Sequence, residues 1–271
     1  MRLSSIVVYP IKSCGPIALD RAVVTRRGLL HDRRFMIVET SGRFVTQREE
    51  PRLTQVKTAI EGDALIVEAA DHGRVETALV PDGGELGATR AVTVWRSTLE
   101  APEVPALSAF FTRFLARDVA CVAMTDTIHR AINPKHANEG DEVSFADGYP
   151  LLLASESSRR DLEARAGVPL VMARFRPNVV VEGATAWDED HWSHVSIGGV
   201  LFRAPKPCAR CVITTLDPET GQADKEPLKT LATFRRVDGE VMFGLNLVPV
   251  FEEGEAERVL EVGASVRRAD G

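Results

Sequence analysis

The sequence is poor in cysteine, has no long hydrophobic run and carries no excess of positive charge. Four cysteines in 271 residues are too few for a disulfide framework, and with no export signal we expect a reducing, cytoplasmic location. No apolar run approaches the ~20 residues that a membrane-spanning helix needs, so we expect no membrane association. The 39 acidic residues outnumber the 33 Lys and Arg, which does not favour a nucleic-acid partner.

What is present indicates a globular protein that is mainly β with a few helices. Hydrophobic residues make up 44% and charged residues 27% of the chain, a balance typical of soluble domains. Short apolar or alternating segments follow one another without intervening helices, which argues against a parallel α/β fold and favours barrel-like or strongly curled sheets. The predicted strands are Leu3–Tyr9, Arg21–Thr25, Phe35–Glu39, Arg43–Gln47, Asp63–Glu68, Arg74–Val80, Ala91–Trp95, Val168–Met172, Asn178–Glu182, Ser193–Ile197, Val200–Pro205, Val212–Leu216 and Val241–Val250.

Three helices and one domain boundary complete the prediction. Val104–Arg117 has phenylalanines at helical spacing, Ser155–Ala166 begins with a capping serine and ends before a glycine, and Glu226–Arg235 has a proline in its first turn. We expect the boundary after the phenylalanine helix, which gives domains at residues 1–120 and 121–271. No Gly/Ser linker separates the two parts, so we expect them to pack against each other.

The most informative chemical motif is a CxxC formed by Cys208 and Cys211. A structural zinc site needs more ligands at suitable spacing, and the histidines at positions 129, 136, 191 and 194 do not provide it. A thioredoxin-type pair begins a helix, whereas a β-branched run follows here. The third interpretation is a single thiolate that binds a soft transition metal, with Arg210 close enough in sequence to stabilise it.

Basic turns in both parts of the chain suggest a site for a phosphorylated ligand. Lys12 and Ser13 follow the first predicted strand, and Arg176 with Asn178 precedes a later one. Lys supplies a point charge and Arg a planar fork of donors, both suited to phosphate. Together with one thiol, these turns fit a phosphorylated cofactor whose metal is bound by sulfur.

Two further features accompany those turns. The doublet Arg33 and Arg34 also leads into a predicted strand. Asp147 lies in a turn before an apolar segment, where it is either an ordinary turn aspartate or an acid or hydrogen-bond acceptor beside a reacting centre.

These motifs together resemble the MOSC family, which is named for the C-terminal domain of molybdenum-cofactor sulfurases. The resemblance covers nearly the whole chain and is most specific from Pro207 to Gly221, which is similar to the corresponding segment of amidoxime-reducing members of the family. It implies an N-terminal MOSC-associated β-barrel domain packed on a MOSC domain, and the family's association with pyridoxal phosphate comes with it.

The resemblance also implies a molybdenum cofactor in its molybdopterin form. Cys211 would be the molybdenum ligand and Asp147 a catalytic neighbour of the metal, with Cys208 beside them or structural. The cofactor would be held by Lys12, Ser13, Arg33 or Arg34, Arg176 and Asn178.

The function that follows from the resemblance is reduction of N-hydroxylated compounds such as amidoximes, hydroxylamines and N-hydroxylated bases. No cysteine follows Cys211, so electrons would come from a separate ferredoxin, flavoprotein or cytochrome. The alternatives are a sulfur carrier with a persulfide on Cys211, a protein that carries or delivers the cofactor, and a zinc-stapled binding module.

Overall fold

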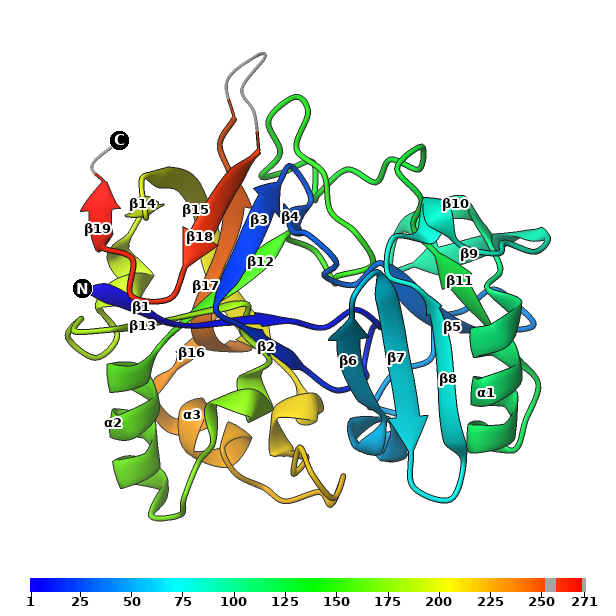
Figure 1. Ribbon diagram of the computed structural model, residues 1–271. Coiled ribbons are helices and arrows are strands. Elements are labelled where there is room, and N and C mark those ends of the chain that lie inside the picture. The colour runs from blue at the N-terminus through cyan, green and yellow to red at the C-terminus, as the bar shows by residue number, and fades with distance from the viewer. Residues whose placement is uncertain (252–256, 270–271) are drawn as a thin grey trace.

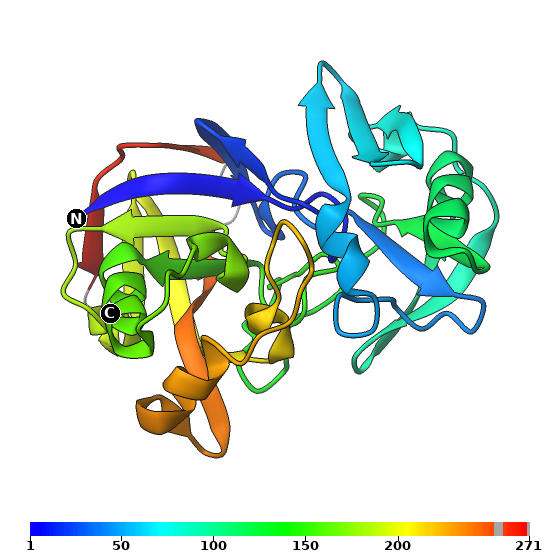
Figure 2. The same ribbon diagram turned by 90° about the horizontal axis from the view of Figure 1, so that it is seen from below.

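The computed structural model describes residues 1–251 and 257–269, and it confirms a mainly β protein (Figure 1). Two lobes are visible in Figure 1 and, from below, in Figure 2. One lobe contains a nine-stranded sheet and the other contains several small sheets and one helix. Short turns connect most strands, in agreement with the close spacing of strand signals in the sequence.

The large sheet draws its strands from both ends of the chain. Its members are β1 (Arg2–Val8), β2 (Ile17–Leu19), β12 (Leu151–Ser155), β13 (Val179–Glu182), β14 (His194–Ile197), β15 (Val200–Arg210), β16 (Arg236–Val237), β17 (Glu240–Pro249) and β19 (Val266–Ala269). They lie in the order β19-β14-β15-β17-β12-β13-β1-β2, with β16 pairing to β17. β12 and β13 run parallel, and β1 pairs antiparallel with β13. The N-terminal strand is therefore a full member of a sheet built mainly from the second half.

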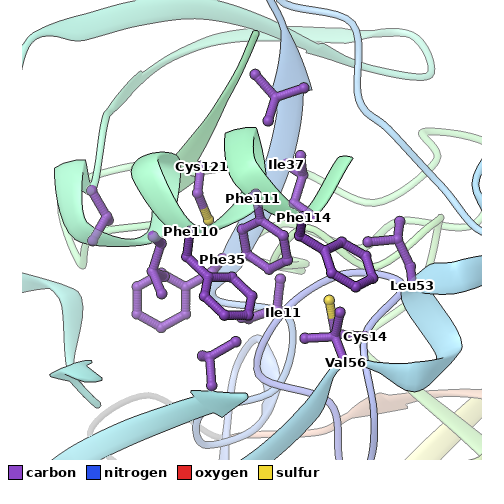
Figure 3. Close-up of a cluster of buried hydrophobic side chains, with 14 of the residues drawn as sticks. Ile11, Cys14, Phe35, Ile37, Leu53, Val56, Phe110, Phe111, Phe114 and Cys121 are labelled. Atoms are coloured by element: carbon purple, nitrogen blue, oxygen red, sulfur yellow. The ribbon is translucent and has the colours of Figure 1, made fainter. Parts of the chain in front are cut away.

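The second lobe is built from short antiparallel units around a helix. Its strands are β5 (Phe35–Glu39), β6 (Lys57–Glu61), β7 (Ala64–Ala69), β8 (Gly73–Ala78), β9 (Thr89–Val94), β10 (Ser97–Pro102) and β11 (Val119–Ala123), and its helix is α1 (Pro105–Leu115). The phenylalanines Phe110, Phe111 and Phe114 of α1 pack into a buried cluster that includes the thiols of Cys14 and Cys121 (Figure 3). Burial raises the pKa of Cys14 to about 12, so this thiol is uncharged and part of the core.

A small sheet ties the two ends of the chain together. β3 (Arg21–Thr25) pairs with β4 (Gly28–Leu29) and with β18 (Arg258–Glu261). The division at residue 120 stays a proposal about the sequence, since β1 and β3 hydrogen-bond with strands from the second half while β11 pairs with β5.

The remaining helices are short. α2 (Glu156–Ala166) and α3 (Leu228–Phe234) contribute buried residues to one apolar cluster beside the large sheet. The 3-10 helices are η1 (Pro51–Gln55), η2 (Pro81–Gly83), η3 (Met172–Phe175), η4 (Asp188–His191) and η5 (Val212–Thr215).

Three predicted strands were wrong, and hydrogen bonding explains the most important one. Val212–Leu216 forms η5, because the hydroxyls of Thr214 and Thr215 donate to the carbonyls of Cys211 and Val212 and hold a tight turn. Arg43–Gln47 makes only isolated bridges at its first two residues. Val168–Met172 is irregular before it enters η3, and Val171 is exposed.

Candidate cofactor-binding site

One pocket of about 430 Å³ brings together residues from both lobes. Its walls come from the segments after β1, before β5, between β5 and η1, at the β9–β10 turn, before β12, between η3 and β13, and at the junction of β15 and η5. The side chains discussed below that line it are Lys12, Ser13, Arg33, Arg48, Trp95, Asp147, Tyr149, Arg176, Asn178, Lys206, Cys208, Arg210, Cys211 and Glu240. Residues from near the N-terminus (Lys12) and from the C-terminal part of the chain (Glu240) therefore share one cavity.

Lys12 joins the segment after β1 to the loop before β12 in this pocket. Its side chain is buried, its Nζ donates to the Phe145 carbonyl at 2.9 Å, and it forms an ion pair with Asp147. It also lies 5.3 Å from the centre of the Phe44 ring. Burial lowers the pKa of Lys12, and the neighbouring Asp147 carboxylate partly offsets that effect.

Asp147 faces the pocket and is held as a carboxylate. Enclosure by the pocket walls acts to raise its pKa, but the charges of Lys12 and Arg48 and a hydrogen bond from Trp95 outweigh this and hold the pKa below its ordinary value. Arg130 supports the loop by donating to the Asp147 carbonyl at 2.9 Å. Asp147 is thus better suited to accept a hydrogen bond than to deliver a proton.

Tyr9 contacts two guanidinium groups that differ in their charge balance. The Cζ atoms of Arg33 and Arg176 each lie 4.2 Å from the centre of its ring. Arg33 is neutralised by Asp32, with Nη1 2.7 and 2.6 Å from the two carboxylate oxygens. Arg176 makes no ion pair with any described residue, and its buried Nη2 has no hydrogen-bond partner among them.

The unpaired state of Arg176 indicates an anionic ligand. Burial lowers the pKa of Arg176 to about 10, so the group is still a cation near neutral pH. A buried cation with an unused donor is costly to leave unpaired. A phosphate oxygen in the pocket would complete its hydrogen bonding.

The two cysteines of the CxxC have different arginine partners. Arg48 Nη2 lies 3.3 Å from the Sγ of Cys211, and Arg210 Nη1 lies 3.1 Å from the Sγ of Cys208. The arginine beside Cys211 in sequence therefore contacts the other cysteine, and Arg48 takes the place next to the Cys211 sulfur. Arg210 instead follows the alternation of β15, which puts positions 208 and 210 on the same face, and its Nη2 donates to the Phe175 carbonyl at 2.7 Å.

The predicted site residues are brought together with one exception. Lys12, Ser13, Arg33, Arg176, Asn178, Asp147 and Cys211 line the pocket, whereas Arg34 is not among its lining residues. Arg34 is buried elsewhere, where its Nε donates to the Met124 carbonyl at 2.7 Å and its Nη2 pairs with Asp126 at 2.8 Å.

Asn178 lines the pocket, but its side chain already makes hydrogen bonds to backbone groups. Its Nδ2 donates to the Val7 carbonyl at 3.2 Å, and its Oδ1 accepts from the Leu152 amide at 3.1 Å. Ser13 adopts a φ of 71° and is fixed by a 2.7 Å hydrogen bond from Gln47 to its carbonyl. The backbone at both positions is therefore set before any ligand binds.

Sequence reasoning missed Arg48, Trp95 and Tyr9. Tyr9 ends the first predicted strand and Arg48 directly follows the predicted strand Arg43–Gln47, but these positions do not show that Arg48 lines the pocket or that Tyr9 contacts two arginines. Trp95 follows a predicted strand and gives no spacing signal. The available clue for Trp95 is a large aromatic residue at a turn, where Gly or Asn is the usual choice.

The pocket as a whole is cationic. Its lining includes six Lys and Arg side chains against two carboxylates, those of Asp147 and Glu240. Such a surface favours a ligand with more than one negative charge. Among the described residues, no group of three or more His, Cys, Asp and Glu could hold a metal ion, so a zinc staple has no ligand set there.

Comparison with known proteins gives the family. Residues 1–118 match the MOSC N-terminal beta barrel domain and residues 140–267 match the MOSC domain. Mitochondrial amidoxime reducing component 2 of Macaca fascicularis is 32% identical over 90% of this chain and 75% of its own length. The chain belongs to the MOSC family.

Two further relatives show that similar proteins carry different functional names. The bovine (Bos taurus) mitochondrial amidoxime reducing component 2 is 34% identical, over 87% of this chain and 73% of its own length. A molybdenum cofactor sulfurase of Solanum lycopersicum is 31% identical, over 90% of this chain but 33% of its own length. These names support a function of the MOSC chain that is related to the molybdenum cofactor.

The pocket residues fit that cofactor. The unpaired Arg176 donor and the cationic lining suit a pterin phosphate, and a thiol in the same cavity suits molybdenum. No α-helix among residues 1–251 and 257–269 has the length and apolar character needed to span a bilayer.

Proposed function

We propose that this protein is a molybdenum-cofactor-dependent reductase of N-hydroxylated compounds, with Cys211 as the metal ligand. The observation that carries the proposal is a single cavity that contains the Cys211 thiol and the unpaired guanidinium of Arg176. Relatives named for amidoxime reduction, which align over most of this chain, support the choice of substrate class.

Each side chain has a distinct part in this proposal. Arg176 and Lys12 would bind the phosphate, Ser13, Arg33 and Asn178 would fix the position of the pterin, and the Cys211 sulfur would bind the metal. When bound, the cofactor would supply the two-electron redox centre for this reaction. In the net reaction the N–O bond breaks, two electrons and two protons are consumed, and the oxygen leaves as water.

Electrons would come from another protein. Cys14 and Cys121 are buried in the core, and no cluster of metal ligands is found among the described residues. We therefore propose a ferredoxin, a flavoprotein or a cytochrome as the donor. Asp147, held as a carboxylate, would accept a hydrogen bond from the hydroxyl or amine group of the substrate.

Metal and pterin analysis of Cys211→Ala beside Cys208→Ala tests the proposal. The wild-type protein, produced with cofactor supply, should contain molybdenum near one atom per chain and reduce benzamidoxime with an artificial donor. Cys211→Ala should lose both properties, because the metal loses its sulfur ligand. Cys208→Ala should keep most of both, since its sulfur is bound to Arg210. Equal losses in the two variants would contradict the assignment.

The second candidate function is transfer of sulfur or of the cofactor itself. The similarity to a molybdenum cofactor sulfurase favours it, and a thiol close to Arg48 could carry a persulfide. Labile sulfur on Cys211 without molybdenum, or rapid release of the cofactor to an acceptor enzyme, would favour this candidate over the reductase.

A further inference from the structure

Trp95 occupies an unusual place for a large aromatic residue. It begins the two-residue turn of the β9–β10 hairpin, where Val94 pairs with Ser97, and its φ is 55°. Bulky residues rarely adopt this left-handed conformation, which costs energy that the surrounding structure must offset. Half of the residue is exposed (51%), so burial of the indole is a weak reason for that strain.

The indole is fixed beside the reacting end of the pocket. Arg48 Cζ lies 5.2 Å from its ring centre, and the Phe44 ring lies 5.3 Å away at an angle of 57°. Arg48 is the same side chain whose Nη2 reaches the Cys211 sulfur at 3.3 Å. Trp95 is thus one contact away from the residue that touches the thiol, and it lines the cavity that contains that thiol.

We propose that Trp95 is a specificity-determining residue that stacks on the planar ring of an aromatic substrate. An exposed indole on a short hairpin offers a flat π surface, and stacking on it favours conjugated rings over aliphatic groups of similar size. This inference rests on the proposed reductase function for its substrate class. It adds that aromatic amidoximes bind better than aliphatic ones because of a residue of the N-terminal part.

Fluorescence provides a test that does not depend on turnover. The chain has three tryptophans, and Trp192 is buried. Benzamidoxime should quench the emission of the wild-type protein in a saturable way, acetamidoxime should not, and Trp95→Leu should abolish the saturable part. Equal quenching by both compounds, or saturable quenching that persists in Trp95→Leu, would overturn the inference.

Kinetics separate this inference from the function on which it rests. Trp95→Leu should raise the ratio of the benzamidoxime KM to the acetamidoxime KM about tenfold, and Trp95→Phe, which also lacks the indole N–H but keeps a ring, should restore most of that ratio. An equal fall in kcat/KM for both substrates would overturn the stacking role and leave the proposed reductase function in place. If the wild-type protein reduces neither compound but shows the saturable quenching, the reductase fails and the ring-binding surface stands.

Discussion

Two regions of the molecule enclose polar groups in opposite ways. In the pocket, cations predominate, Asp147 is held ionised and Arg176 is left without a partner. In the region between α2 and η4, Glu189 is fully buried, and its Oε1 has no hydrogen-bond partner. Burial raises the pKa of Glu189 to about 7, although Ser158 donates to it at 2.9 Å.

The comparison shows that an unpaired buried group has two different explanations. A carboxyl group can escape the cost of burial by taking up a proton, which is what the raised pKa of Glu189 indicates. Arginine keeps its charge at physiological pH, so the unused Nη2 donor of Arg176 is best satisfied by an anion. The region around Glu189 is therefore satisfied without a ligand, whereas the pocket around Arg176 is completed by one.

The largest expected effect comes from removing the unpaired cation. Arg176→Met should lower occupancy by the molybdenum cofactor at least tenfold, because charge-assisted hydrogen bonds to phosphate are lost. The free energy of unfolding of the cofactor-free protein should change by less than about 1 kcal/mol. The substitution removes the cost of burying a charge, and it also removes the favourable contact of the guanidinium with the Tyr9 ring, so the two effects largely cancel. Pterin analysis and chemical denaturation measure the two effects.

Arg174→Met is the matched control for that prediction. Arg174 belongs to the same turn, but it pairs with Asp217 at 3.6 Å and donates to the Thr215 carbonyl at 3.1 Å. Arg174→Met should lower the free energy of unfolding and leave the occupancy by the cofactor unchanged. Unchanged occupancy in Arg176→Met, or the same loss in both variants, would remove the contrast between the two regions.

Glu189 should make stability fall as pH rises. Its pKa is raised in the folded protein from 4.5 to about 7, so the folded state binds the proton more tightly than the unfolded state does. This contribution is fully present below about pH 4.5 and is lost as pH rises through about 7, with a total of about 3 kcal/mol. Glu189→Gln stays neutral and should lack this loss.

Denaturation of the wild-type protein, Glu189→Gln and Glu76→Gln at several pH values checks the sign. Glu76 is exposed, and its variant should follow the wild-type protein. If the stability difference between the wild-type protein and Glu189→Gln stays constant from pH 5 to pH 8, Glu189 is not held protonated by its surroundings.

The fold class and most of the pocket could be predicted from the sequence because they rest on local signals. Alternating apolar segments identified many of the strands, the Lys12 and Cys211 motifs follow strands, and the Arg176 motif precedes one. What could not be predicted is the direction in which individual side chains point in the folded protein. Arg33 and Arg34 diverge in the turn before β5, where Arg33 has a φ of 48°, and the sequence does not show which of the two side chains faces the cavity.

The same limit explains the partner of Cys211. Sequence proximity favoured Arg210, but the arginine that reaches the sulfur lies 163 positions earlier, on the loop between β5 and η1. That loop is fastened to the pocket by Gln47, whose Nε2 donates to the Ser13 carbonyl. Contacts of this kind arise from packing between distant segments, for which one sequence has no local signal.

The smallest expected effect concerns the carboxylate that the cations hold ionised. Asp147→Asn removes the ion pair with buried Lys12, but about half of the Asp147 side chain is exposed (55%), so the loss in the free energy of unfolding should be about 1 kcal/mol. The pKa of Asp147 is lowered in the folded state. Its contribution is therefore present above the ordinary aspartate pKa and is lost as pH falls through the lower, folded value.

The wild-type protein should consequently lose stability relative to Asp147→Asn only in strongly acidic solution, below about pH 4. This is the reverse of the behaviour expected for Glu189, although both side chains are carboxyl groups of the second half. Unfolding curves of the two proteins from pH 3 to pH 7 test it. If they converge instead near neutral pH, Asp147 takes up a proton there, and it would be a proton donor to the substrate rather than a hydrogen-bond acceptor.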